Sequence, residues 1–207
     1  MAMRRSRSGE ELGPKGQVAQ LNATQRKLEE ARFFVTLLKR VEDAGPITKE
    51  KLDDEATFLF SALINATYSV LECLAEEGKQ ALRRRRDRAV ALQSRSLVNE
   101  IGTVKEGRPV LYGGPKSGRN NEPPGLRALS VHHKMVDTQH REHTAGMLGS
   151  APFGQLRFGA VETARSLYVL DPGTESPVQI VPLMVEHLRE LEQLVARWEN
   201  EIRSDGE

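Results

Sequence analysis

The fold is decided by residues 48–78, which read TKEKLDDEATFLFSALINATYSVLECLAEEG. Apolar side chains recur along this stretch at steps of three and four, in two neighbouring rows. The first row contains Leu52, Ala56, Leu59, Leu63, Ala66, Val70 and Leu74, and the second contains Phe60, Ile64, Thr67 and Leu71. A helix that is apolar around more than half of its circumference must be covered on several sides. The pattern predicts a long helix in the middle of a bundle, capped by Thr48 and ended by Gly78.

Three more helical patterns surround this central stretch. One begins at Asn22, a typical N-cap residue, and ends at the Ala44, Gly45, Pro46 stop. Another is expected from Lys79 to Ile101, and a last one over residues 182–203. The last pattern places one apolar stripe along its helix, formed by Val185, Leu188, Leu191, Val195, Trp198 and Ile202. Together the four patterns predict a mainly α protein with an up-and-down helical bundle.

The segment between the third and the last helix has a different character. Residues 102–125 contain six glycines and four prolines, which predicts a long loop. Helical spacing resumes after Pro124 and is expected to continue to about Gly146. Residues 153–181 alternate towards a period of two around the turn signal Asp171, Pro172, Gly173, which predicts a small antiparallel β-hairpin or sheet insertion.

Length and composition favour one domain over residues 19–207, preceded by a flexible basic tail over residues 1–18. Thirty Lys and Arg residues against 29 Asp and Glu residues give a net charge of +1, so attraction to a polyanion requires local clustering. Cys73 is the only cysteine, which excludes an internal disulfide and favours a reducing compartment. Its apolar neighbours predict a small buried side chain. Because the N-terminus lacks a signal-peptide core and no window approaches the length of a membrane span, a cytoplasmic protein without a membrane partner is expected.

A basic run follows the central helix, at Arg83, Arg84, Arg85, Arg86 and Arg88. Such a run is commonly a solvated helix surface. The alternative is a nucleic-acid-binding stripe using Arg83, Arg84 and Arg86, because guanidinium groups fork onto phosphate oxygens.

Four of the five histidines lie together at His132, His133, His140 and His143. On a helix His133, Asp137 and His140 would share one face, with the spacing needed to hold a divalent metal. The alternative is a polar helix surface without a cofactor.

Arg127 precedes His132 and His133 by five and six residues. An arginine can stabilise the charge of a phosphorane while an imidazole transfers protons, as cleavage of RNA by its own 2'-hydroxyl requires. Five residues on a straight helix separate two side chains by about 140°. The three residues therefore form a catalytic site only if Arg127 lies in an irregular first turn or a dimer brings two copies together.

A row of small residues on the central helix would allow close approach of another backbone. The row contains Ala62, Asn65, Ser69 and Cys73. It predicts a close helix contact, either within the chain or in a homodimer.

Residues 58–70, FLFSALINATYSV, resemble a bundle helix of bacterial proteins related to the HEPN superfamily, in which an aromatic residue and Ser-Ala and Ser-Val pairs recur. Arg127 to His132 is similar to the arginine-x4-histidine motif of that superfamily. The resemblance implies a dimer that binds RNA or cuts it without metal, within a toxin or defence system, with Arg127 and His132 of both subunits in one cleft. The residue after the arginine is usually polar in active members and is Ala128 here, which favours the alternative of a non-catalytic helical dimer acting as an interaction protein.

Overall fold

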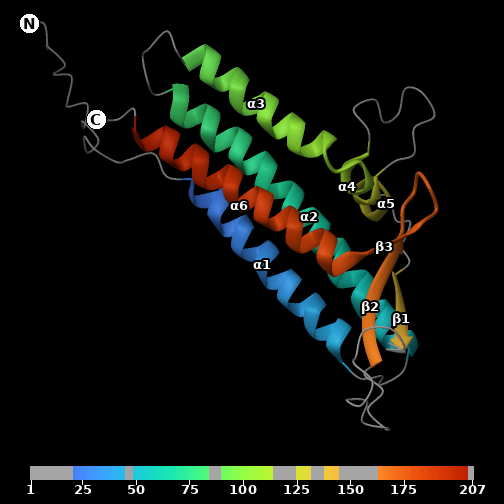
Figure 1. Cartoon of the computed structure of the whole chain (residues 1–207). Helices are drawn as coiled ribbons and strands as arrows, with labels where there is room; N and C mark the ends of the chain where they lie inside the picture. Colours follow the sequence, from blue (N-terminus) through green and yellow to red (C-terminus); the bar gives the residue numbers. More distant parts are fainter. Residues whose placement is uncertain are drawn as a thin grey trace, which may run out of the picture.

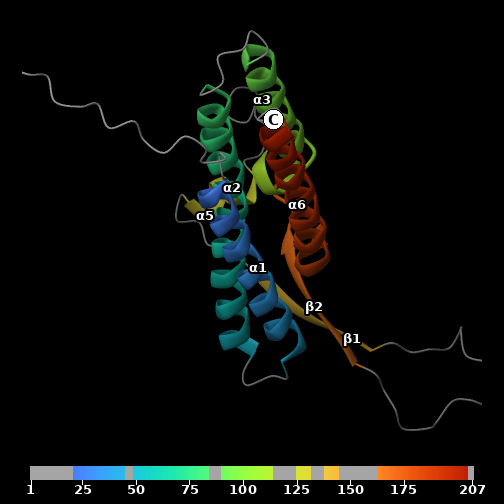
Figure 2. The same ribbon diagram turned by 90° about the vertical axis from the view of Figure 1, so that its left-hand side faces the viewer.

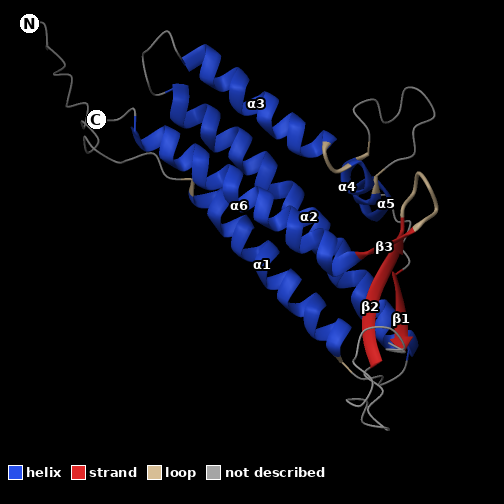
Figure 3. Ribbon diagram, viewed as in Figure 1, coloured by secondary structure: helices blue, strands red, loops and turns tan. Residues whose placement is uncertain are grey.

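A computed structural model describes residues 21–44, 49–83, 90–113, 125–131, 138–144 and 163–204. Four long helices lie side by side (Figure 1): α1 (Asn22–Asp43), α2 (Lys49–Arg83), α3 (Val90–Glu106) and α6 (Ile180–Ser204). Between α3 and α6 come the short helices α4 (Pro109–Tyr112) and α5 (Leu126–Val131) and the strands β1 (Thr138–Thr144), β2 (Thr163–Leu170) and β3 (Pro177–Gln179). The prediction of a mainly α bundle with a small antiparallel sheet is confirmed (Figure 3).

Helix α2 is the central helix of the bundle, as its two apolar rows predict. It packs against α1, α3 and α6. Phe60, Leu63, Ile64 and Leu71 are fully buried, and Leu191 and Leu194 of α6 join them in the same core. Each such side chain stabilises the fold by about 1.5–3 kcal/mol relative to an exposed one.

The first helix begins at Asn22, but the prediction that the Asn22 side chain caps it is wrong. Glu77 of α2 takes that role. The backbone N–H groups of Ala23 and Thr24 each donate to its carboxylate at 2.9 Å, and the Thr24 hydroxyl donates to it at 2.7 Å. The cap therefore also ties the start of α1 to the end of α2.

Gly78 does not end the central helix, which continues to Arg83. A Cβ atom at this position would lie 2.5 Å from Cδ2 of Leu97 in α3, so the glycine permits close packing of the two helices instead. The predicted helix from Lys79 to Ile101 is correspondingly displaced, since α3 covers Val90–Glu106. Thr48 lies outside the described residues.

The predicted loop over residues 102–125 is partly helical. Helix α3 continues to Glu106, and α4 begins with Pro109, a residue suited to a first helical turn because it lacks the N–H that would be unpaired there. Residues 114–124 lie outside the described part of the chain.

The largest difference from the predictions concerns residues 126–146. Of the residues that the structure describes in this segment, Leu126–Val131 is helical, and Thr138–Thr144 is a strand that pairs with β2 over seven positions, with His140 opposite Leu167. The antiparallel order is β1-β2-β3, and the sheet lies at one end of the bundle (Figures 1 and 2). The reason is tertiary: Thr138 is buried and its hydroxyl lies 2.8 Å from the Thr57 hydroxyl of α2, a pairing that no local periodicity encodes.

One helix does not meet the expectation that no window approaches the roughly 18 apolar residues of a membrane span. Within Asp53–Arg83, 18 residues reach a mean hydropathy of 1.5, long and apolar enough by composition alone to cross a membrane. The centre of a helical bundle requires the same composition, and α2 has three helices packed on it.

Candidate functional site

Arg127 lies at the start of α5 with its guanidinium stacked on an aromatic ring. The carbon atom Cζ is 3.3 Å from the centroid of the Tyr68 ring in α2, a cation–π contact. Its Nε atom is buried and has no hydrogen-bond partner among the residues that the structure describes. No carboxylate among the described residues forms an ion pair with it, so the ring is the favourable contact that its charge makes in this part of the chain.

A second cation shares the same ring. Nζ of Lys105, from α3, lies 4.2 Å from the Tyr68 centroid. Lys105 also has no ion pair with any carboxylate of the described ranges. Two positive charges on one ring repel each other, and the repulsion is relieved when an anion binds between or beside them. The surroundings of Tyr68 therefore have the electrostatics of an anion site.

The position of Arg127 is fixed by the backbone just before it. A Cβ atom on Gly125 would lie 2.2 Å from the Gly113 nitrogen and 2.4 Å from the Tyr112 carbonyl carbon. Only glycine permits this approach of α5 to α4. Leu126 then enters the core with 1% of its surface exposed. Helix α5 begins at Leu126, directly after this contact, and the Leu129 N–H donates to the Gly125 carbonyl at 3.3 Å.

A hydrogen-bonded network adjoins the Tyr68 ring on the side of α6. The Tyr112 ring packs on Tyr68 at 5.8 Å between centroids, and the Tyr112 hydroxyl lies 2.6 Å from Nε2 of His187. Nδ1 of His187 lies 3.3 Å from the Glu190 carboxylate. Arg108 donates to Glu190 through Nε at 3.0 Å and again through Nη2, and it pairs with Glu186 at 3.0 Å.

Burial and charge set the protonation states of this network. Burial raises the pKa of the Tyr112 phenol and lowers the pKa of the His187 imidazole, which has no exposed surface. Hydrogen bonds from Arg108 lower the pKa of the Glu190 carboxyl. At neutral pH, Tyr112 is therefore protonated, His187 neutral and Glu190 ionised. The consistent arrangement has the Tyr112 hydroxyl donating to Nε2 and the Nδ1–H of His187 donating to Glu190.

The other residues predicted for a site are placed as follows. Arg83 is exposed at the end of α2, whereas Arg84 and Arg86 lie outside the described residues. His132, His133 and Asp137 lie outside them as well. The helical face that would align His133, Asp137 and His140 does not form, because His140 is in β1. Within the described ranges, no group of three His, Cys, Asp or Glu residues could hold a metal ion.

The small-residue row of α2 and its cysteine are only partly buried. Ala62, Asn65, Ser69 and Cys73 all keep some exposed surface, so the prediction that Cys73 is buried is not met. Burial is still sufficient to raise the pKa of the Cys73 thiol, which keeps it protonated. Trp198 is a core residue as predicted, with 4% exposure and its indole N–H donating to Glu100.

Sequence patterns missed most of the network. Arg108 and Tyr112 lie in the region predicted to be a loop, and Tyr68 was identified only as one residue of the segment 58–70 that carries the family resemblance. The one available signal was His187, which stands one position before Leu188 of the apolar stripe of α6 and is buried with it. Comparison of the chain with models of known protein families, with curated proteins and with solved structures gives no match.

Proposed function

We propose that this protein binds RNA through the backbone phosphates and cleaves it without a metal, with Arg127 in the phosphate-binding site. The observation that carries the proposal is the Arg127 guanidinium, stacked on Tyr68 and without a carboxylate partner among the described residues. A buried cation of a structural ion pair would have such a partner. An arginine without one has binding capacity left for an anion.

The stacked geometry suits phosphate in particular. Stacking uses the face of the guanidinium and leaves the N–H donors in its plane free of the ring. Because Nε is buried, the two Nη groups are the donors that can fork onto two phosphate oxygens. Lys105 adds a second positive charge at the same ring. Arg108 contributes little, because Glu190 and Glu186 already pair with it.

The basic run offers a second contact for a chain of phosphates. Arg83 is fifteen residues after Tyr68 on the same helix, which is about 22 Å at the rise of an α-helix. Arg83, Arg84 and Arg86 would then hold the RNA at a distance from the Arg127 site and contribute affinity that falls with salt.

In the proposed reaction one imidazole, from His132 or His133, removes the proton of a ribose 2'-hydroxyl. The oxygen attacks the adjacent phosphorus, and the 5'-oxygen leaves with a proton returned by an imidazolium. Arg127 stabilises the negative charge of the phosphorane between these steps. The products carry a 2',3'-cyclic phosphate and a 5'-hydroxyl. The proposal includes a homodimer, in which two such sites approach each other.

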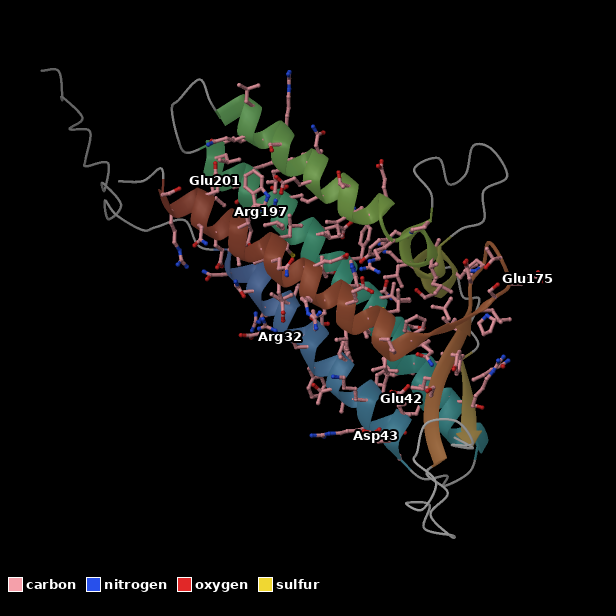
Figure 4. All side chains as sticks on the ribbon, in the orientation of Figure 1. Arg32, Glu42, Asp43, Glu175, Arg197 and Glu201 are labelled. Atoms are coloured by element: carbon pink, nitrogen blue, oxygen red, sulfur yellow. The ribbon has the colours of Figure 1, made fainter. Side chains whose placement is uncertain are left out.

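The test is cleavage of 5'-labelled single-stranded and structured RNA, with and without EDTA, by wild type, Arg127→Ala, His132→Ala and His133→Ala. We expect EDTA-resistant cleavage with cyclic phosphate ends, a loss of about 10²–10³-fold in rate for Arg127→Ala, and a loss of about 10²–10⁴-fold for the catalytic histidine. Arg32→Ala is the matched control, because Arg32 is an exposed arginine on α1 (Figure 4). It pairs with Glu192 at 2.8 Å. Equal activity of Arg127→Ala and wild type would refute the proposal.

A second candidate is a non-catalytic interaction protein, and exposed aromatic side chains favour it. Phe33 and Phe58 are 58% and 70% exposed, on α1 and α2 respectively. Exposed aromatic residues are typical of protein interfaces. In that case clean protein leaves RNA intact, and Phe58→Ser changes the self-association measured by sedimentation. If EDTA and His140→Ala each abolish cleavage, the result would instead support the alternative of a metal-dependent enzyme.

A further inference from the structure

We infer that Tyr112 and His187 are positioning residues that hold Arg127 over the Tyr68 ring. Their effect on RNA rests on the proposed function, whereas the geometry of Arg127 can be measured without RNA.

Tyr112 connects the site to α6 through two different contacts. Its ring lies against Tyr68, the ring that carries Arg127, with 5.8 Å between centroids. It also contacts His187 of α6, with the ring centroids 5.4 Å apart in an edge-on arrangement and the hydroxyl 2.6 Å from Nε2. A displacement of the Tyr112 side chain therefore moves the surface on which the guanidinium stacks.

The backbone gives a second connection between the same residues. Gly125 is packed so closely on Tyr112 and Gly113 that no Cβ atom fits, and Arg127 follows two residues later. Leu129 donates its N–H to the Gly125 carbonyl at 3.3 Å, so the first turn of α5 starts from this contact. Helix α4 thus controls both the ring under the guanidinium and the helix that bears it.

The far end of the network is anchored by charge. Arg108 lies just before α4 and pairs with Glu190 and Glu186 of α6. His187 has no exposed surface, whereas 41% of the Glu190 side chain is exposed. Glu190 is therefore one point at which the network meets solvent, and Glu186, whose side chain is 64% exposed, is another.

The contacts accommodate two arrangements of protons. With neutral His187, the Tyr112 hydroxyl donates to Nε2. With protonated His187, Nε2–H donates to the Tyr112 oxygen, and the Tyr112 hydroxyl turns to Thr67, whose oxygen lies 3.3 Å away. Thr67 donates to the Ile64 carbonyl in both cases, so its oxygen stays available as an acceptor.

Two charged groups act on His187 in opposite directions. Glu190 of α6 favours the protonated form, and Arg108 beside α4 disfavours it. Arg127 of α5 acts electrostatically on the Tyr112 hydroxyl. Protonation of His187 thus reverses its hydrogen bond to Tyr112. Because the Tyr112 ring packs on Tyr68, the environment of Arg127 changes with it.

The first experiment observes the Arg127 Nε–H signal in ¹H–¹⁵N spectra of the full chain, identified by its loss in Arg127→Lys. Stacking over Tyr68 shifts this signal upfield, and we expect its position to change with pH as His187 titrates. In Tyr112→Phe the upfield shift is reduced and the response to pH is lost. In His187→Gln, whose amide can replace Nε2 as a partner of Tyr112, the upfield shift remains and the response to pH disappears.

The second experiment measures Kd for labelled RNA at pH 7.5 by anisotropy, with thermal unfolding of each variant as a check on folding. Tyr112→Phe weakens binding on the order of tenfold, as expected for loss of a buried hydrogen bond. The single variant His187→Gln keeps its affinity for RNA within about twofold of wild type, because the amide replaces Nε2 as the partner of Tyr112. Arg32→Ala is the control whose affinity is unchanged.

The two proposals fail in different ways. An upfield Arg127 signal that depends on Tyr112 while the wild type binds no RNA would refute the proposed function and leave the positioning role standing. RNA binding that depends on Arg127 but not on Tyr112, or an Arg127 signal identical in Tyr112→Phe and wild type, would overturn the positioning role.

Discussion

Two helical glycines, Gly78 in α2 and Gly102 in α3, make a matched pair for testing how closely the two helices pack. Both gain the same helix propensity on substitution by alanine, about 0.8–1 kcal/mol. Gly102 has no atom within 4 Å of an added Cβ, so Gly102→Ala stabilises the fold by about that amount. The difference in unfolding free energy between the two variants therefore gives the steric cost of a Cβ atom at position 78.

At Gly78 the added Cβ meets Cδ2 of Leu97 at 2.5 Å, well inside van der Waals contact. Leu97 is fully buried, so it can move away only by disturbing its neighbours. Overpacking of this kind costs about 1–3 kcal/mol, which cancels or exceeds the gain in propensity. We expect Gly78→Ala to be less stable than Gly102→Ala by about 1–3 kcal/mol.

The assay is urea unfolding of both variants, followed by circular dichroism, with the slope of the transition compared between them. Leu97→Ala alone is expected to destabilise the fold by about 2–5 kcal/mol, and by less in the Gly78→Ala background, because the second substitution removes the clashing methyl group. If Gly78→Ala is as stabilising as Gly102→Ala, the close approach of α2 and α3 is not present in solution.

Three further predictions concern the cap, the sheet and the buried histidine. Glu77→Ala is expected to lower the unfolding free energy by about 0.5–2 kcal/mol through loss of the α1 cap, with the exposed Glu76→Ala as control, and chemical denaturation measures both. Thr57→Val is expected to lower the unfolding free energy by about 1–3 kcal/mol, because it leaves the buried Thr138 hydroxyl without its α2 side-chain partner. It should also speed amide exchange in β1. Unchanged exchange would show that β1 is held by β2 alone. The pKa of His187 is lower in the folded chain than its ordinary value of 6.5, so the unfolded chain binds more protons and stability falls as pH drops from 7 through that value. His187→Gln removes this part of the pH dependence, and denaturation at a series of pH values from 5 to 8 measures it.

The elements that could be predicted from the sequence are those whose pattern is fixed by one buried face. The apolar rows of α2 and the stripe of α6 repeat at helical spacing over many turns, and both helices form within a few residues of the predicted bounds, apart from the end of α2 at Arg83. The Asp171 to Gly173 turn is likewise local, since the Gly173 N–H donates to the Asp171 side chain at 2.8 Å. In each case the secondary structure is determined by residues that are close together in the sequence.

The errors occur where a distant residue decides the local structure. Glycine at position 78 favours the end of a helix by its own preference, yet here the helix continues past it, at a point where an added Cβ would lie 2.5 Å from Cδ2 of Leu97. Residues 138–144 have no strong preference, and pairing with β2 makes them a strand. Spacing counted along the chain therefore misplaced His140, since the geometry of a metal site depends on the secondary structure that carries it.

The candidate site depends both on a local sequence motif and on contacts with residues far away in the chain. Arg127 could therefore be identified from the sequence, whereas its surroundings could not. The arginine stands in a short motif that is visible in sequence. Its chemical state depends instead on Tyr68 and Lys105, which come from two other helices. A guanidinium paired with a carboxylate would be structural, whereas one that shares an aromatic ring with a second cation is suited to an anion. The same motif is thus compatible with a structural role and with an anion-binding role. The contact that decides between them is made by Tyr68 of α2, 59 residues away in the chain.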